Sequence, residues 1–363
     1  MSTPPTEATG AGLTARLPRN LGLDRRWGEN PVGAARLRES LGSSRYQRMP
    51  GPAVVVYRIA NGRHQQTGVV VEVSIEDYRA GRIRQHEATQ PERERLLEES
   101  TEASGIERTP VTLAHSPDRA LRSVTESLTS TEPDVDLTAG DGTRHTAWFR
   151  RDPELARAAE LGLRGVDALY IADGHHRMAA AERYATRRHH LGPDHPAAFT
   201  LAALFPADEM RVFGFHRCLP VPRDSAARTL EKLRSLAVAE RWEEHSAAAP
   251  EPGVVVVRFA GERHRLKLRP RDADGHVRAS LDIVTLDEEV LPALGITQAS
   301  CGTGPPESCR HPADEAVLLV AHPPSMGQIM AVSDAGLVMP PKSTWFAPKP
   351  APGLFLRDLT DPA

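Results

Sequence analysis

The stretch Tyr170–Arg177 reads YIADGHHR and continues directly into an alanine-rich segment, MAAAERY, at residues 178–184. The apolar residues before Asp173 predict a short buried strand, and the alanine-rich segment predicts a helix, so the polar cluster lies on a turn between them. At such a turn the first backbone N–H groups of the helix have no acceptor within the helix, and the helix dipole favours an anion. Gly174 allows close backbone approach and Arg177 adds a forked cation. We therefore expect a phosphate to bind here.

Composition narrows the class of protein. The chain has 363 residues, 40% of them hydrophobic, a length that favours two domains. Its formal net charge of -3 disfavours a nucleic-acid partner, because nucleic-acid binding usually needs a strongly basic domain. No apolar run reaches the length of about 18 residues that would suggest a membrane span, so no membrane partner and a cytoplasmic location are expected. Three cysteines are too few for a disulfide framework, which predicts reduced thiols.

Strands and helices alternate along most of the chain, which predicts an α/β protein. Residues 1–50 form a variable N-terminal segment whose first part is expected to be disordered. A first α/β domain is predicted at 51–220, with residues 213–220 extending its sheet. A smaller α/β domain with a proline-rich strap is predicted at 221–363. Within the first domain, Asn61-Gly62 predicts a hairpin turn between two strands.

A second informative stretch, Ile83–Glu87, reads IRQHE and precedes a predicted helix start, with Thr89 as N-cap and Pro91 in the first turn. His86 and Glu87 therefore lie on the loop before that helix. A carboxylate in this position is well placed for acid–base chemistry. Considered alone, Glu87 would more often be a solvated surface residue. Only the presence of the other motifs in the same chain favours a catalytic role.

The polar turn also has structural interpretations. Asp173 could cap the helix that follows it, and capping is compatible with catalysis. Of His175 and His176, one could face a ligand while the other is bound by the backbone, and the sequence does not choose between them. The loop Cys301–Cys309 and His311 contain residue types of a zinc site without its tight spacing, which predicts a surface loop.

The segment Met339–Lys349 reads MPPKSTWFAPK. Its polar residues could reach a phosphate; they are Lys342, Ser343, Thr344 and Lys349. Its prolines and the Trp345-Phe346 pair also form a rigid extended strap with aromatic packing anchors, and packing is the favoured interpretation.

In this order, the IRQHE, ADGHHR and MPPKSTWFAPK motifs resemble a large bacterial and archaeal family long described as a domain of unknown function. The core of that family is similar to the ParB/sulfiredoxin fold of the free-serine kinases. The resemblance runs from Val54 to Leu356. It implies a ParB/sulfiredoxin-like nucleotide-binding core within a mixed α/β (α+β) chain.

The resemblance further implies an enzyme that phosphorylates the hydroxyl of free L-serine to O-phospho-L-serine with ATP or ADP and Mg²⁺. Glu87 is then the general base, and Asp173 is a second catalytic residue and the candidate Mg²⁺ ligand. The phosphate-binding residues are Gly174, His175, His176 and Arg177, and additional candidates are His86, Arg84, Lys342, Ser343 and Thr344. Nucleotide and L-serine are the expected partners, and a homodimer stays open. The alternative is a ParB-like regulatory protein that binds or hydrolyses nucleotide without a small-molecule acceptor.

Overall fold

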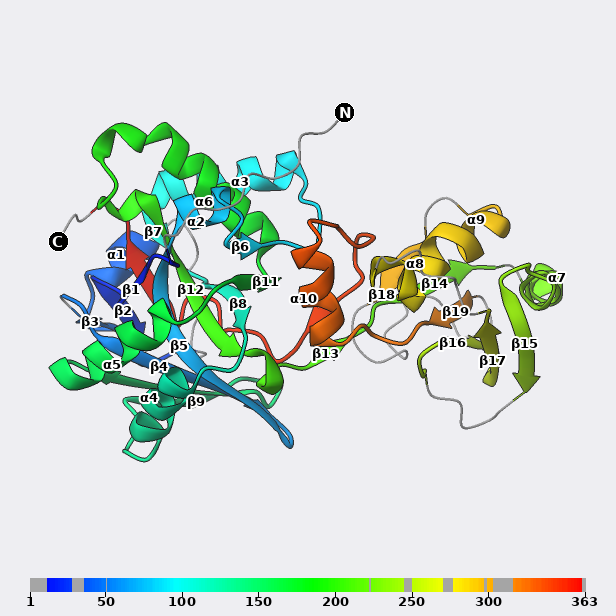
Figure 1. Ribbon diagram of the computed structural model, residues 1–363, viewed down its shortest axis with the longest axis horizontal. Coiled ribbons are helices and arrows are strands. Elements are labelled where there is room, and N and C mark those ends of the chain that lie inside the picture. The colour runs from blue at the N-terminus through cyan, green and yellow to red at the C-terminus, as the bar shows by residue number, and fades with distance from the viewer. Residues whose placement is uncertain are drawn as a thin grey trace. The chain divides into compact units, whose positions relative to one another are not determined.

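The computed structural model describes residues 12–27, 36–49, 51–221, 223–244, 250–269, 277–296, 299–302 and 316–360. The chain forms two compact units (Figure 1). The first unit comprises Met1–Gln85, Thr89–Met210 and Pro348–Ala363, and the second comprises His86–Ala88 and Arg211–Ala347. The boundaries predicted from the sequence, at residues 50 and 220, differ from these because the units follow contacts in space rather than chain order.

The first unit is a mixed α/β structure, which confirms the predicted class. Its helices are α1 (Leu37–Leu41), α2 (Ile75–Arg79), α3 (Pro91–Ser104), α4 (Arg119–Thr129), α5 (Pro153–Arg164) and α6 (His175–Arg187). Its strands are β1 (Ala15–Arg16), β2 (Leu21–Asp24), β3 (Tyr46–Met49), β4 (Val54–Asn61), β5 (His64–Ser74), β6 (Ile83–Arg84), β7 (Ile106–Glu107), β8 (Val111–His115), β9 (Val135–Thr138), β10 (Arg144–Arg150), β11 (Leu169–Asp173), β12 (Phe199–Pro206) and β21 (Phe355–Asp358).

A nine-stranded mixed sheet forms the centre of this unit. Its strand order is β6-β11-β8-β12-β5-β4-β10-β9, and β1 also pairs with β5. β11 runs parallel to β6, and β12 runs parallel to β8. The predicted hairpin is confirmed. β4 and β5 pair in antiparallel register from Val55 opposite Val70 to Asn61 opposite His64, and Gly62 in the turn between them has a φ of 58°. The strand that ends at Asp173 is therefore held on both sides, by β6 and by β8.

The run Val54–Tyr57 is buried on both faces of the sheet. Its even-numbered valines pack with Leu121 of α4 and Leu163 of α5, helices that lie on one side of β4 in Figure 1. Its odd-numbered residues pack with Leu23 of β2 and Phe355 of β21. These two strands belong to a four-stranded sheet of order β3-β2-β21-β7. Burial on both faces explains why this strand reads as a continuous apolar run instead of alternating with polar residues.

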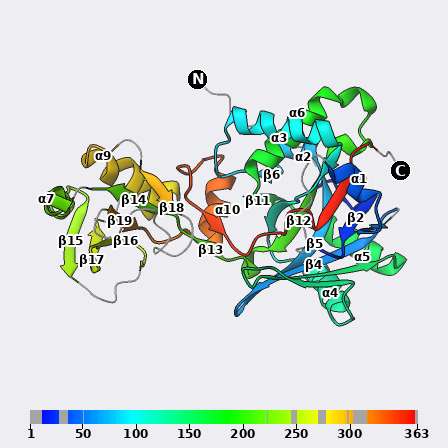
Figure 2. The same cartoon turned by 180° about the vertical axis from the view of Figure 1, so that it is seen from behind.

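The second unit contains a six-stranded sheet of order β15-β17-β16-β19-β14-β18 and the two-stranded pair β13-β20 (Figure 2). Its strands are β13 (Val212–Phe213), β14 (His216–Pro220), β15 (Ala239–Glu244), β16 (Val254–Phe259), β17 (Glu262–Leu268), β18 (Ser300–Gly302), β19 (Ala316–Val320) and β20 (Trp345–Phe346). Its helices are α7 (Arg223–Arg234), α8 (Asp282–Thr285), α9 (Leu291–Ala293) and α10 (Met326–Asp334), and Leu286–Val290 is π-helical.

Two sequence predictions are corrected in the second unit. Residues 213–220 do not extend the first sheet, because β14 pairs with β18 and β19, and an apolar strand carries no local sign of which sheet it joins. Cys218 of β14 is buried and disulfide-bonded, so the expectation of reduced thiols is wrong at this residue. A cysteine count cannot show which thiols the fold brings together. The predictions for the first residues of the chain and for most of the loop around Cys309 and His311 fall on residues 1–11 and 303–315, outside the described ones.

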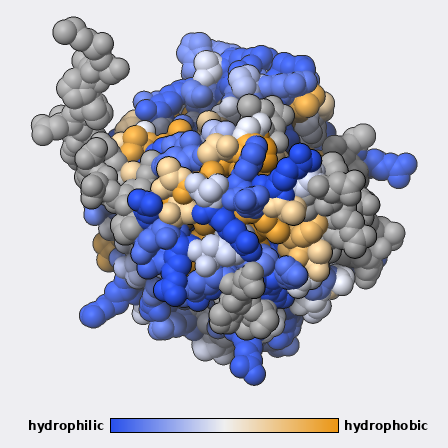
Figure 3. All heavy atoms as spheres, turned by 90° about the vertical axis from the view of Figure 1, so that its right-hand side faces the viewer, coloured by the Kyte–Doolittle hydropathy of each residue, from blue (hydrophilic) through white to orange (hydrophobic). Residues whose placement is uncertain are grey.

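The surface of the molecule is mostly hydrophilic on the face that Figure 3 shows. The hydrophilic side chains there surround smaller groups of apolar ones. None of the described helices combines the length and the apolar character that crossing a bilayer requires.

Acidification is expected to destabilise the first unit through His145 of β10. The imidazole is buried, with Nδ1 2.7 Å from the Tyr57 hydroxyl, and burial lowers the pKa of His145 to about 4. The unfolded chain takes up this proton near its ordinary pKa of about 6.5, before the folded chain does, so the free energy of unfolding falls as the pH drops from about 6.5 to 4, by about 3 kcal/mol. Urea unfolding of the wild type across this range measures the fall. In the variant His145→Gln the free energy of unfolding should fall less over this pH range. An equal fall in both proteins would show that His145 is not the cause.

Candidate functional site

The polar turn joins β11 to α6, as the sequence predicts. β11 ends at Asp173, Gly174 is the N-cap, and His175–Arg177 form the first turn of the helix. Gly174 has a φ of 105°, a conformation that residues with a side chain rarely adopt. A Cβ atom at Gly174 would lie 2.7 Å from Nη2 of Arg177. Glycine therefore permits both the backbone turn and the position of the Arg177 guanidinium.

The carboxylate of Asp173 lies between two cations. Its Oδ2 accepts a hydrogen bond from Nη2 of Arg177 at 2.8 Å, and its Oδ1 accepts one from Nζ of Lys349. Burial alone would raise the pKa of Asp173, but the charges of Arg177 and Lys349 outweigh burial and lower the pKa to about 2. The carboxylate is therefore ionised at neutral pH. It does not cap α6, because the N-cap is Gly174 and no side chain caps this helix, so the capping interpretation is wrong.

Other contacts of the turn fix its remaining side chains. Nη2 of Arg177 also lies 3.3 Å from the carbonyl of Pro110, and Nε of Arg177 is buried without a hydrogen-bond partner among the described residues. The backbone N–H of Gln90 donates to Nε2 of His176 at 3.1 Å, which ties the loop before α3 to the turn. His175 is buried, whereas His176 is partly exposed. Of the two histidines, His176 is thus the one that a ligand can reach.

Lys349 is a residue whose partner the sequence does not reveal. It is the last residue of the strap motif but belongs to the first unit, and 176 residues separate it from Asp173. Its side chain is 44% exposed, so a dissolved ligand can reach the ammonium group. Only its character as a lysine near the end of the strap motif suggested a phosphate contact, and no local pattern could pair it with Asp173. Together, Asp173, Gly174, Arg177 and Lys349 are called the corner below.

The other two motifs meet within the second unit. Glu87 forms an isolated parallel bridge with Met339, and the N–H of Lys342 lies 3.4 Å from its Oε1. His86 is buried, and its Nε2 lies 3.0 Å from the Thr344 hydroxyl. The His86-Glu87 pair is therefore fixed against the strap. The Glu87 carboxylate itself is partly exposed.

The strap has its own support, which sequence reasoning missed. Arg217 is buried, pairs with Asp287 at 2.5 Å and donates to the carbonyl of Lys342 at 3.0 Å. Lys342 has a φ of 58°, a backbone conformation that costs energy in a residue with a side chain. Ser343 donates to the carbonyl of Pro340 at 2.5 Å and is buried, as is Thr344. Ser343 and Thr344 are thus buried and hydrogen-bonded within the second unit, and the backbone N–H of Lys342 lies within reach of Glu87.

Arg84 lies beside the strand that carries Asp173. Strand β6 pairs with β11, with Arg84 opposite Tyr170. The guanidinium carbon lies 5.8 Å from the centre of the Tyr170 ring, a cation–π distance. Arg84 also donates to the carbonyl of Gly81 at 3.2 Å. These contacts support the strand, and none of them involves a residue of the corner.

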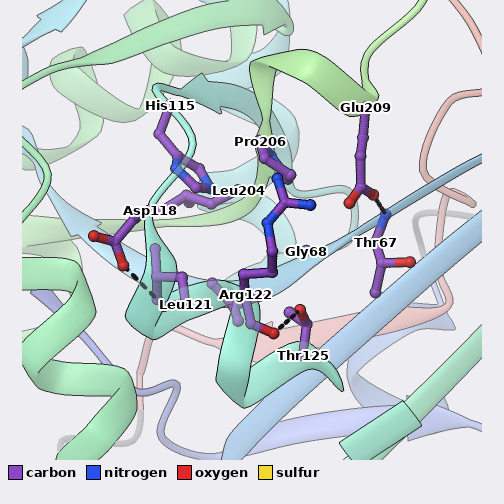
Figure 4. A pocket seen from close by; sticks show the side chains of 11 residues that line it. Thr67, Gly68, His115, Asp118, Leu121, Arg122, Thr125, Leu204, Pro206 and Glu209 are labelled. Carbon is purple, nitrogen blue, oxygen red and sulfur yellow. Dashed lines mark hydrogen bonds between the residues drawn. The ribbon is translucent and has the colours of Figure 1, made fainter. Parts of the chain in front are cut away.

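Two cavities in the first unit do not include the corner. One has a volume of about 10 Å³ between β5, α4 and β12, and its lining includes His115, Arg122 and Glu209 (Figure 4). This volume is enough for about one water molecule and far too small for a nucleotide. The other has a volume of about 440 Å³ and is lined by residues that include Arg188 and His195. Charged groups there already pair, as Arg188 does with Glu102 at 2.8 Å.

The corner does not fit a resident metal ion. Both oxygens of Asp173 are paired with cations. Among the described residues, no three His, Cys, Asp or Glu side chains come together in an arrangement that could hold a metal. A Mg²⁺ ion at this site would therefore have to be bound mainly by the phosphates of a nucleotide, which is its usual form of binding in phosphoryl-transfer enzymes.

Comparison with known proteins places the chain in a family. The model of the family described as "Protein of unknown function (DUF1015)" matches residues 31–286, which is more than half of the chain. The chain belongs to the DUF1015 family. This membership agrees with the motif resemblance to a family of unknown function. No curated protein matches this DUF1015 sequence.

Several solved structures are similar to this DUF1015 protein at low sequence identity. SbnI with a C-terminal truncation from Staphylococcus aureus has a TM-score of 0.43 and 14% identity, covering 78% of this chain and 87% of that one. A free serine kinase in complex with AMP has a TM-score of 0.40 and 15% identity, covering 78% and 91%. A conserved hypothetical protein from Pyrococcus furiosus has a TM-score of 0.40 and 14% identity, covering 81% and 97%.

Proposed function

We propose that this DUF1015 protein is a small-molecule kinase that transfers a phosphoryl group from ATP or ADP to the hydroxyl of free L-serine. The observation that supports the proposal is the corner, where a glycine N-cap begins α6 and the forked cation of Arg177 lies in the first turn of that helix, beside Asp173. A helix N-terminus with an adjacent arginine is a strong site for phosphate. The choice of L-serine as acceptor comes from the motif resemblance.

Phosphoryl transfer needs mainly positioning and neutralisation of charge, so few groups suffice. In the proposed site the backbone N–H groups of Gly174 and His175 and the side chains of His176 and Arg177 bind the phosphates. The serine hydroxyl loses its proton to Glu87 as its oxygen forms a bond to the terminal phosphorus. The bond from that phosphorus to the bridging oxygen breaks, and ADP leaves from ATP, or AMP from ADP.

The choice of Glu87 as the base comes from the motif resemblance. Only Ala88 and Thr89 separate Glu87 from Gln90, and the N–H of Gln90 donates to His176 in the first turn of α6. The base is held by the strap through Lys342 rather than by the helix that follows it. The short segment from Glu87 to Gln90 is thus held at its start by the N–H of Lys342 and at its end by His176.

The decisive experiment is product formation by the purified full chain. The protein is incubated with L-serine, MgCl₂ and either ATP or ADP, and O-phospho-L-serine is quantified by mass spectrometry, with D-serine and L-threonine as competing acceptors. Formation of O-phospho-L-serine supports the proposal. Hydrolysis of nucleotide at a rate independent of any acceptor would instead favour the alternative, a ParB-like regulatory protein. Absence of both activities and of nucleotide binding would overturn both functions.

Gly174→Ala tests the turn itself. The new Cβ requires a strained backbone, at a cost of about 1–3 kcal/mol in the free energy of unfolding, and it pushes the guanidinium of Arg177 away from the corner. The expected result is a loss of both stability and ADP affinity, measured by urea unfolding and by calorimetry. Gly192→Ala is the matched control, because Gly192 has a φ of 93° with nothing within 4 Å. It should lose stability and keep its ADP affinity; an equal loss of affinity in both variants would contradict the role of Gly174.

A further inference from the structure

We infer that Lys349 is a phosphate-binding residue of the corner, and that Asp173 is an internal anion that occupies Lys349 and Arg177 until a nucleotide phosphate takes its place. This inference rests on the nucleotide site of the proposed function but not on the transfer to serine. It gives Asp173 a role different from that of a metal ligand.

The arrangement of charges carries the inference. Each oxygen of the Asp173 carboxylate accepts a hydrogen bond from a different cation, Oδ1 from Lys349 and Oδ2 from Arg177. A phosphate also presents several oxygens to several donors at once, and Arg with Lys is a usual pair for binding it. Asp173 therefore makes with these two side chains the contacts that a phosphate would make. The two cations outnumber the carboxylate, which leaves one positive charge for an incoming anion.

The charged side chains of the corner are also accessible to a dissolved ligand. The side chains of Lys349, Arg177 and Asp173 are 44%, 29% and 23% exposed. The lysine has a flexible stem, so its ammonium can turn from Asp173 to a phosphate without a change in the backbone. The arginine is held more firmly, by the carbonyl of Pro110 as well as by Asp173. Lys349 is thus the cation expected to move, and Arg177 the one expected to stay.

Competition between Asp173 and the phosphate has a consequence that a metal ligand would not show. If the carboxylate occupies the two cations and repels the incoming phosphate, its neutralisation should strengthen nucleotide binding in the absence of Mg²⁺. The variant Asp173→Asn is therefore expected to bind ADP roughly 5- to 10-fold more tightly than the wild type in EDTA. A ligand for Mg²⁺ or a purely structural residue would give unchanged or weaker binding after the same substitution.

The test is calorimetric titration of the full chain with ADP in EDTA and without serine. Lys349→Met should weaken ADP binding roughly 10- to 100-fold, because a charge-assisted contact to phosphate is lost, and Lys349→Arg should keep most of the affinity. Lys267→Met is the matched control, since Lys267 is exposed and also pairs with one carboxylate, that of Glu240 at 3.3 Å. It should bind ADP as the wild type does.

Titration with adenosine separates phosphate binding from a general loss of structure. Adenosine affinity should be equal in the wild type and in Lys349→Met, because adenosine carries no phosphate. Wild-type ADP affinity in Lys349→Met, or weaker ADP binding in a folded Asp173→Asn, would overturn the inference. Protection of Lys349 from acetylation by ADP but not by adenosine, read in the wild type by mass spectrometry, tests it without any substitution, and equal labelling with and without ADP would count against it. None of these readouts depends on formation of O-phospho-L-serine, so the acceptor can be wrong while the phosphate site stands.

Discussion

Glu87→Gln is expected to lower kcat for phosphorylation of L-serine by about 10²- to 10⁴-fold, the usual contribution of a general base. Glutamine keeps the size of the side chain and an oxygen that can accept the N–H of Lys342, but it cannot take the proton of the hydroxyl. ADP and ATP affinities should stay close to those of the wild type, because the phosphates are bound by the corner. Rapid-quench measurement of kcat together with calorimetry of nucleotide binding separates the two effects.

Glu92→Gln serves as the control for this substitution. Glu92 is an exposed carboxylate in the first turn of α3, five residues further along the chain. Its replacement should leave kcat unchanged. Full turnover by Glu87→Gln, or an equal loss in both variants, would show that the base lies elsewhere.

Arg357→Ala is expected to lower the free energy of unfolding of the first unit by about 3–5 kcal/mol, because it removes the buried cation that Glu72 and Glu107 share. Arg357 and Glu72 are each 1% exposed and pair at 3.0 Å, and Arg357 also pairs with Glu107 at 2.9 Å. The same guanidinium donates to the carbonyls of Pro196 and Phe199. Urea unfolding monitored by circular dichroism measures the loss.

The control here is Arg95→Ala, which removes an exposed ion pair with Glu99 on α3. A pair of this kind contributes about 0.3–0.5 kcal/mol, so the control should unfold almost as the wild type does. A loss in Arg357→Ala as small as that of the control would mean that Glu72 and Glu107 are stabilised without Arg357. The neighbouring Arg16, which pairs with Glu72 at 2.8 Å, would then be the residue to test.

Local patterns predicted the parts of the site that are built from local structure. The apolar run before Asp173 and the alanine-rich segment after it fix a strand and a helix, and the turn between them follows. The start of α3 is likewise visible in Pro91 and the acidic residues after it, although the N-cap is Gln90 and not Thr89. Such features depend on neighbours in the chain, which a sequence displays directly.

Contacts between distant segments could not be predicted in the same way. Arg357 meets its partner Glu72 across 285 residues, and Lys349 meets Asp173 across 176. An arginine or a lysine in an apolar or proline-rich tail has many compatible partners, and only the tertiary fold selects one. The predictions that residues 213–220 extend the first sheet and that Cys218 is reduced failed for the same reason. The roles of Glu87 and of the turn residues in catalysis stay predictions.

The return of the last segment to the first unit affects how the protein can be made. β21 lies between β2 and β7 in the four-stranded sheet, and Phe355 and Leu354 fill the core beneath it. During synthesis, β2 and β7 emerge from the ribosome long before β21 does, and residues Arg211–Ala347 of the second unit are translated in between. Until β21 is synthesised, the first unit therefore lacks the strand that pairs with both β2 and β7 in its smaller sheet. A stop codon shortly after residue 347 would remove that strand permanently.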